Sequence, residues 1–174
     1  MTIMVLELKV PHETSWAALR PLLPVALSYL LSFLYLGIYW NNHHHMLHTV
    51  RNVTGGILWA NLHLLFWLSL IPFATAWSGE NQLHAAPTFV YGAVSLLAAL
   101  AYFILQGTII RSQGREGELA RAVGSDIKGK LSPLFYALAL PLAFWQPWIS
   151  MALYTLVALM WLVPDQRIEA HVKA

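Results

Sequence analysis

The sequence predicts an all-α, polytopic membrane protein that forms one domain over residues 1–174. Hydrophobic residues make up 58% of the chain and charged residues only 10%, a balance outside the usual range of soluble domains. Several apolar stretches approach or exceed the roughly 20 residues that a helix needs to cross a bilayer. The eight tryptophans and seven tyrosines agree with this class, because both side chains favour the level of the lipid headgroups.

Six transmembrane segments can be assigned along the chain. The opening stretch MTIMVLELKV is apolar, but as a helix it would be only about 15 Å long, half the thickness of the hydrocarbon core. We therefore interpret it as a truncated first transmembrane helix. The six predicted helices lie at about residues 1–10, 22–45, 57–77, 88–110, 131–145 and 147–163.

The last two segments come from a single apolar run, Leu131 to Trp161. One helix of 31 residues would be about 46 Å long, more than the hydrocarbon core requires. Gln146 and Pro147, near the middle of the run, favour two short helices joined by a tight turn. The polar stretch before this run, RSQGREGELARAVGSDIKGK, is predicted to be a solvated connector with a short surface helix.

The basic residues predict on which side of the membrane each loop lies. Eight of the ten fall in the second loop, the fourth loop or the C-terminal tail. Cytoplasmic loops carry an excess of Lys and Arg, so these loops and the C-terminus are predicted to be cytoplasmic. The eight are Arg51, Arg111, Arg115, Arg121, Lys128, Lys130, Arg167 and Lys173, whereas Lys9 and Arg20 lie in the first loop.

The stretch YWNNHHHMLH, from Tyr39 to His48, places an unusual set of polar residues at the end of the second segment. His44 and His48 share a helix face at i, i+4, and His45 and His48 share one at i, i+3, so a two-imidazole metal site is geometrically possible. Two other interpretations remain open. One is a polar helix end surrounded by water and headgroups, and the other is a hydrogen-bonded network with another helix.

Polar residues also lie inside the third segment. Asn61 and His63 would each be costly in lipid if unpaired, so they should face another helix or water. An interhelical hydrogen bond and contact with a transported species both fit this placement. Acidic residues such as Glu80 and Glu169 lie in loops or at segment ends, which argues against a proton-coupled pump. No nucleotide-binding, metalloprotease or hydrolase motif occurs, and nothing predicts an enzyme or nucleic-acid binding.

The opening stretch has one narrow face on a helix, formed by Thr2, Ile3, Leu6 and Val10. By itself this stripe is compatible with helix packing or with pore lining.

Several motifs together carry a resemblance to a known family. The second segment ends with Trp40, Asn42, His43 and His44, the third reads LWANLHLLFWLSLIPF with Asn61, and the exit from the sixth reads WLVPDQRIE. In this order and spacing they resemble the bacterial branch of the transmembrane protein 175 family, whose members are potassium channels with six helices per repeat. The resemblance covers essentially the whole chain.

The resemblance implies a homotetramer in the bacterial inner membrane, with potassium as the permeating ion and no cofactor. In this family the first helices line a central pore, which is constricted by rings of aliphatic side chains close to a threonine layer. By position, the ion-pathway residues would be Thr2, Ile3 and Leu6. An interhelical polar network is expected to include Trp40, Asn42, His43, His44 and Asn61.

The family signature R-x-x-x-F-S-D, which the resemblance places upstream of Thr2, is missing from this chain. We therefore expect a start codon assigned inside the first helix or a truncated chain, in preference to a real loss of the half-helix. The residues that Ser-Asp would hydrogen-bond lose that partner. Two alternative functions follow. One is a non-conducting, truncated membrane subunit, and the other is a haem or metal membrane protein that uses His44, His48 and His63.

Overall fold

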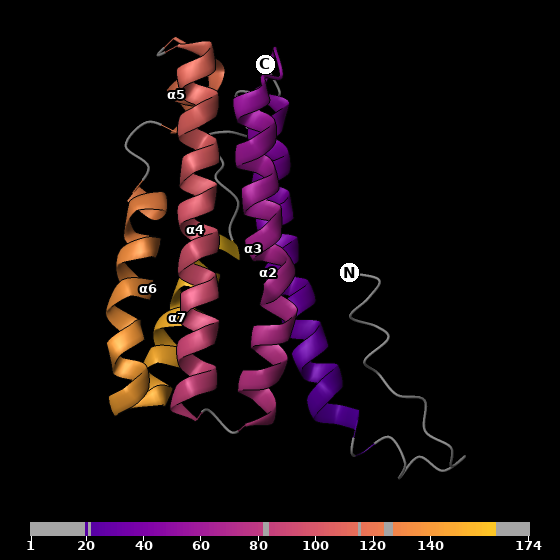
Figure 1. Cartoon of the computed structure of the whole chain (residues 1–174), viewed down its shortest axis with the longest axis vertical. Coiled ribbons are helices and arrows are strands. Elements are labelled where there is room, and N and C mark those ends of the chain that lie inside the picture. Colours follow the sequence, from indigo (N-terminus) through magenta and orange to yellow (C-terminus); the bar gives the residue numbers. More distant parts are fainter. Residues whose placement is uncertain (1–19, 21, 82–83, 115, 124–126, 163–174) are drawn as a thin grey trace, which may run out of the picture.

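A computed structural model describes residues 20, 22–81, 84–114, 116–123 and 127–162 of the chain. The described residues form helices with no strand among them, which confirms the predicted all-α class (Figure 1). The helices are α2 (Leu23–His48), α3 (Gly55–Glu80), α4 (Ala85–Gln113), α5 (Glu118–Val123), α6 (Ile127–Trp145) and α7 (Pro147–Leu162). The predicted first segment, with Thr2, Ile3 and Leu6, lies outside the described residues.

Polar residues set the ends of the long helices. Thr54 precedes α3, and its hydroxyl accepts a hydrogen bond of 3.4 Å from the backbone N–H of Ile57. Gly114 ends α4 with a φ of 81°, a left-handed conformation that glycine adopts at little cost. Both α3 and α4 extend beyond the predicted apolar segments at each end, and α2 continues to His48 rather than ending at residue 45. Hydropathy marks the part of a helix that suits lipid, whereas backbone hydrogen bonding continues into the headgroup region.

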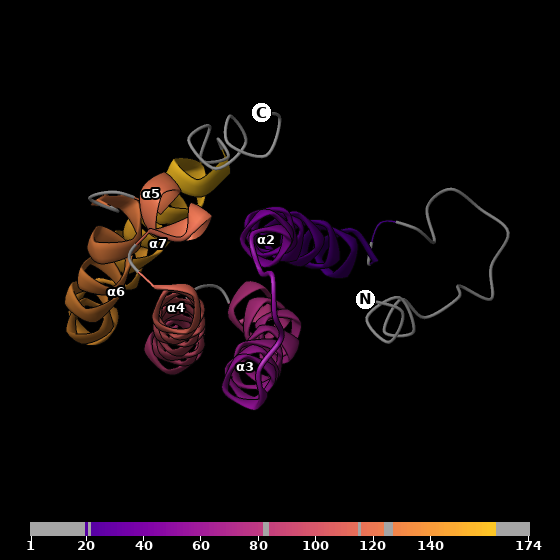
Figure 2. The ribbon, with the colours of Figure 1, turned by 90° about the horizontal axis from the view of Figure 1, so that it is seen from above.

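α4 is the central helix of the bundle. It packs against α3 on one side and against α6 and α7 on the other, while α2 packs against α3 and also contacts α7. The view along the helices shows α4 between α3 and the α6–α7 pair (Figure 2). The short α5 lies at the end of the bundle where α4 ends (Figure 1).

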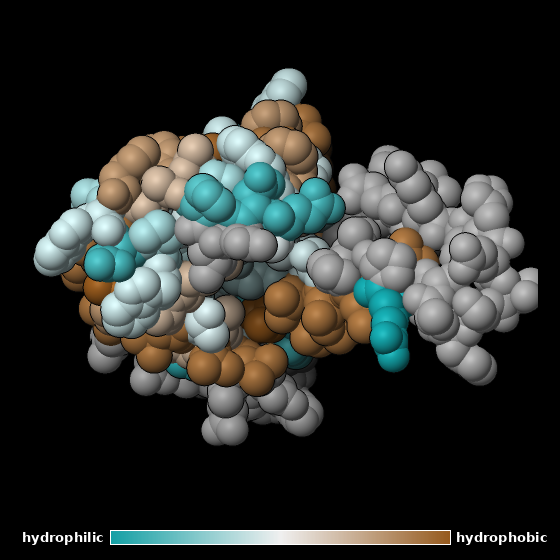
Figure 3. Space-filling model, turned by 90° about the horizontal axis from the view of Figure 1, so that it is seen from below, coloured by the Kyte–Doolittle hydropathy of each residue, from teal (hydrophilic) through white to brown (hydrophobic). Residues whose placement is uncertain are grey.

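The polarity of α2 is reversed relative to a helix of a soluble protein. Its buried positions include Ser28, Ser32 and Asn42, whereas Leu27 and Leu31 are 57% and 60% exposed. Seen from the end where α2 begins, hydrophobic residues also cover much of the flank of the bundle (Figure 3). Within the described ranges, α3 and α4 are both long and apolar enough to cross a membrane. The exposed apolar faces therefore suit a lipid environment.

The helices α6 and α7 form a helical hairpin, and Gln146 is the single residue between them. Pro147 is the first residue of α7, where its missing N–H leaves no helical hydrogen bond unmade. Trp145 and Trp148 on either side are 76% and 62% exposed. This placement suits the aromatic belt at a membrane surface.

Candidate functional site

A contact between α2 and α3 joins two of the predicted polar residues. The Nε2 atom of His43 lies 2.6 Å from the Oδ1 atom of Asn61, with the ring nitrogen donating to the amide oxygen. Both side chains are half-buried. Because α2 and α3 pack side by side, this is an interhelical hydrogen bond of the kind that holds membrane bundles together.

The neighbouring polar residues point in other directions. Asn42 is only 4% exposed, and its Nδ2 donates to the carbonyl oxygen of Ile38 in the same helix over 2.8 Å. Trp40 is 60% exposed, and its indole stacks on the ring of His44 with centroids 5.2 Å apart and planes 15° apart. The predicted set therefore divides: His43 and Asn61 meet, Asn42 faces the bundle interior, and Trp40 and His44 lie on the outside of α2.

The histidines do not gather into the three-residue set considered from the sequence. His44 and His48 lie together, with 3.1 Å between their Nε2 atoms, and both are exposed. His63 lies on α3, where it accepts a hydrogen bond of 2.9 Å from Nε1 of Trp67 one turn away. Among the described residues, no three His, Cys, Asp or Glu side chains are grouped as metal ligands. The alternative of a haem or metal membrane protein that uses all three histidines therefore gains no support from the described residues and stays a prediction.

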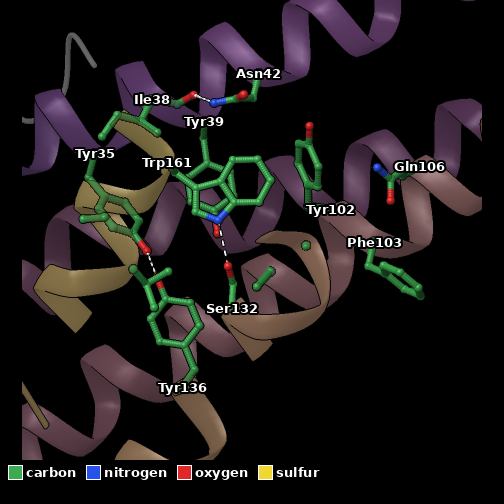
Figure 4. Close-up of a pocket in the computed structure, with 14 residues that line it drawn as sticks. Tyr35, Ile38, Tyr39, Asn42, Tyr102, Phe103, Gln106, Ser132, Tyr136 and Trp161 are labelled. Carbon is green, nitrogen blue, oxygen red and sulfur yellow. Dashed lines mark hydrogen bonds between the residues drawn. The ribbon is translucent and has the colours of Figure 1, made fainter. Parts of the chain in front are cut away.

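Asn42 lines a cavity between α2, α4, α6 and α7 (Figure 4). The space that the centre of a water molecule can reach is about 30 Å³. A buried water needs at least roughly 10–15 Å³ of such space, so the cavity has room for a few waters at most. The lining is aromatic and uncharged in the described part of the chain. It comprises Tyr35, Ile38, Tyr39, Asn42, Ala99, Tyr102, Phe103, Gln106, Gly129, Ser132, Tyr136, Val157, Ala158 and Trp161.

Two polar contacts hold the walls of this cavity together. The hydroxyl groups of Tyr35 on α2 and Tyr136 on α6 form a buried hydrogen bond (Figure 4). The indole Nε1 of Trp161 on α7 donates to Oγ of Ser132 on α6 over 2.7 Å. Ser132 in turn donates to the carbonyl oxygen of Lys128 over 2.7 Å. These bonds link α2 and α7 to α6 without any buried charge.

Ring contacts continue from the cavity through the middle of the bundle. The ring centroids of Tyr35 and Tyr91 are 6.4 Å apart, and those of Tyr91 and Tyr154 are 5.4 Å apart. Tyr154 also lies against Tyr136, with a centroid distance of 5.8 Å. Edge-to-face and tilted ring pairs in this range are favourable. We call these four residues, together with the cavity, the tyrosine-lined interior.

Sequence reasoning did not identify the tyrosine-lined interior. A signal was available on α2, where Tyr35, Tyr39 and Asn42 follow the i, i+4, i+7 spacing of one helix face. The partners come from α4, α6 and α7, and nothing in the local sequence specifies which residues these are. The chemistry of this region is packing and neutral hydrogen bonding, so we assign it a structural role.

The connection between α2 and α3 is tied to the one that follows α4. The Nε2 atom of Gln113 donates to the carbonyl oxygen of Thr49 over 2.8 Å. Arg51 forms an ion pair with Glu118 of α5 at 3.1 Å, with side chains 76% and 44% exposed. Exposed ion pairs contribute little to stability. The hydrogen bond is the firmer of the two links.

A helical bundle with apolar outer faces, membrane-length helices and polar residues such as Ser32 and Asn42 among its buried positions is the architecture of a polytopic membrane protein. Comparison with known proteins narrows this class. A family model described as "Endosomal/lysosomal potassium channel TMEM175" matches residues 1–72. This match includes both residues of the contact between His43 and Asn61.

Relatives match along almost the whole chain. A potassium channel from a Chryseobacterium species is 52% identical over 173 residues, covering 99% of this chain and 90% of the relative. A potassium channel from Streptomyces collinus is 30% identical and covers 91% of this chain and 82% of the relative. The chain therefore belongs to the TMEM175 family.

A solved structure supports the fold independently. The crystal structure of a lysosomal potassium-selective channel TMEM175 homolog from Chamaesiphon minutus superposes with a TM-score of 0.75 at 24% identity. The match covers 94% of this chain and 89% of that one. The helices described above therefore have the arrangement of that protein.

Proposed function

We propose that this chain is the subunit of a potassium-permeable channel. The observation that carries the proposal is the 52% identity, along 99% of the chain, to a protein named as a potassium channel. The apolar outer faces of α2, α3 and α4 support it, because the subunit must sit in a bilayer to conduct. The uncharged interior of the subunit fits a conduction path between subunits rather than through one.

We further propose that residues 1–10 line the pore, with Thr2, Ile3 and Leu6 facing the ion pathway. Rings of Ile and Leu side chains can close a narrow pore by excluding water, and a slight widening lets water return. The hydroxyl of Thr2 can replace part of the water shell of a potassium ion. Selectivity on this basis rests on partial dehydration and does not need a ring of backbone carbonyls.

The channel is proposed to be a homotetramer with its C-terminus in the cytoplasm. A pore lined by one helix from each subunit requires several copies around an axis. Three basic residues at one end of the bundle support the orientation. They are Arg51 in the connection between α2 and α3, Arg111 in the last turn of α4 and Arg121 in α5. Arg20 precedes α2 at the opposite end.

The contact between His43 and Asn61 is proposed to be the surface against which the first helix packs. Both residues are half-buried, and Trp40 beside them is 60% exposed on the surface of this chain. A neighbouring helix that covers this surface would bury the indole, and its polar side chains could hydrogen-bond His43 and Asn61. This is the place where the polar network predicted from the sequence can extend to another segment or subunit.

The test is potassium flux through the purified full chain in liposomes. Flux above that of empty liposomes is expected, with potassium passing faster than sodium, and cross-linking should trap species up to a tetramer. The chain has no cysteine, so single-cysteine variants report cleanly on the pore. Thiol-reactive reagents are expected to change flux in Thr2→Cys, Ile3→Cys and Leu6→Cys.

Leu8→Cys serves as the matched control for this scan, because on a helix residue 8 lies at least about 120° around the axis from residues 2, 3 and 6. The same reagent should leave its flux unchanged. Flux no greater than that of empty liposomes would overturn the proposed conduction. Flux that is equally sensitive at all four positions would overturn the assignment of the pore-lining face.

A further inference from the structure

Two exposed imidazoles at the end of α2 are held in an arrangement that the proposed conduction does not use. His44 and His48 are one helical turn apart, and their Nε2 atoms are 3.1 Å apart. The two ring planes cross at 77° with centroids 4.5 Å apart, so the rings meet at an angle instead of stacking. Both residues are exposed, so a solute can reach the nitrogens.

The separation of the two nitrogens matches that of two ligands on one metal ion. A bond from zinc to an imidazole nitrogen is about 2.0–2.1 Å long. Two such nitrogens lie about 3.3 Å apart on a tetrahedral ion, and about 2.9 Å apart when the ligand–metal–ligand angle is 90°. The observed 3.1 Å falls between these values. The separation of the two nitrogens is therefore the one that binding of a single ion requires.

Neighbouring side chains hold the pair in place before any ion binds. The indole of Trp40 stacks on His44, with an angle of 15° between the planes, and limits the rotation of that ring. His48 is the last residue of α2, and the following Thr49 secures this turn through a hydrogen bond of 2.8 Å from its Oγ1 to the carbonyl oxygen of Met46. A preorganised pair loses less conformational entropy on binding than two free side chains.

We propose that His44 and His48 form a binding site for a first-row transition-metal ion of the Zn²⁺ or Ni²⁺ class. Neutral imidazole suits these ions, whereas Mg²⁺ and Ca²⁺ prefer oxygen ligands. The two nitrogens supply two positions, and water completes the coordination. A bound ion would tie residues 44 and 48 together and stiffen the helix turn next to His43, which bonds Asn61 of α3.

The test is calorimetric titration of the tag-free full chain in detergent with ZnCl₂ and NiCl₂, with MgCl₂ in a parallel experiment. Saturable binding of one ion per chain is expected for Zn²⁺ and Ni²⁺, and no binding for Mg²⁺. His44→Ala and His48→Ala should each weaken binding at least about tenfold, because each removes one of the two ligands. Trp40→Leu should give a smaller loss, since it frees the ring of His44 without removing a ligand.

His45→Ala is the matched control, because this residue lies between the two ligands in sequence and its ring is 6.2 Å from that of His44. The affinity of the His45→Ala variant for Zn²⁺ should equal that of the unmodified chain. An unchanged Tm of each variant without metal shows that the fold is retained, as expected for exposed positions. Absence of Zn²⁺ binding at millimolar concentration, or equal binding in His44→Ala, His48→Ala and His45→Ala, would overturn the proposal. No flux is measured, so this test is independent of the proposed conduction.

Discussion

Helix α2 contributes polar side chains to two regions, the tyrosine-lined interior and the contact with α3. The two regions differ in how completely other helices of this chain cover them. On one face, Tyr35 and Asn42 line the tyrosine-lined interior, which α4, α6 and α7 close. On another face, His43 meets Asn61 of α3, while Trp40 remains largely exposed. The first region is completed by the helices of this chain. The second leaves aromatic and polar groups at its surface.

The first region therefore holds the helices of this chain together, whereas the second exposes groups that another segment can contact. In lipid there is little hydrophobic drive between helices, so close packing and hydrogen bonds carry their association. Tyrosine supplies both, because a large ring and a hydroxyl occupy one side chain. We therefore expect substitutions in the interior to lower stability, and substitutions in the α2–α3 contact to act mainly on function.

Gly92→Ala is expected to cause the largest loss of stability. A Cβ atom at this position of α4 would overlap the hydroxyl of Tyr154 on α7 and lie 3.1 Å from Cδ2 of Leu140 on α6. Tyr154 is 1% exposed, so it has no free space to move into. Overpacking of this kind costs about 1–3 kcal/mol, which a thermal melt in detergent would register as a lower Tm.

Gly107→Ala provides the control in the same helix. A Cβ atom there meets nothing within 4 Å, and alanine favours a helix over glycine by up to about 1 kcal/mol. Its Tm should be unchanged or higher. Equal decreases in both variants would show that helix backbone effects, and not the close approach of α4 and α7, set the stability.

Tyr136→Phe is expected to have an intermediate effect. It removes one hydroxyl from the buried pair with Tyr35 and leaves the other without this partner, at a cost of about 1 kcal/mol. The double variant with Tyr35→Phe should lose less than the sum of the two single variants, because both break the same bond. Tyr29→Phe, at a half-buried position of α2, should leave Tm unchanged. Strictly additive losses would contradict the pairing.

The sequence predicts one of these regions better than the other. An apolar segment with Asn61 inside it requires a polar partner, so an interhelical bond could be anticipated, and the family resemblance placed His43 in the same expected network. The bond between Tyr35 and Tyr136 joins positions 101 residues apart. Local periodicity gives the face on which Tyr35 lies but not the helix that covers it.

The helices themselves follow from hydropathy because lipid imposes a length on each apolar run. Their ends do not follow, since α2 continues through the polar stretch to His48 and α4 spans Ala85–Gln113. In these turns water and headgroups replace lipid. Helix formation there depends on capping residues such as Thr54 and Gly114 rather than on apolarity.

Asn61→Ala is expected to cause the smallest loss of stability and the clearest change in function. The bond to His43 is half-buried, and interhelical bonds of this kind contribute about 0.6 kcal/mol on average, so Tm should fall less than in Tyr136→Phe. His63→Ala is the control on the same helix, since its ring accepts a bond from Trp67 of α3 itself. In liposomes, Asn61→Ala should change potassium flux, whereas Tyr136→Phe and His63→Ala should not. The reverse pattern would place the functional contact in the tyrosine-lined interior and leave the α2–α3 bond as packing.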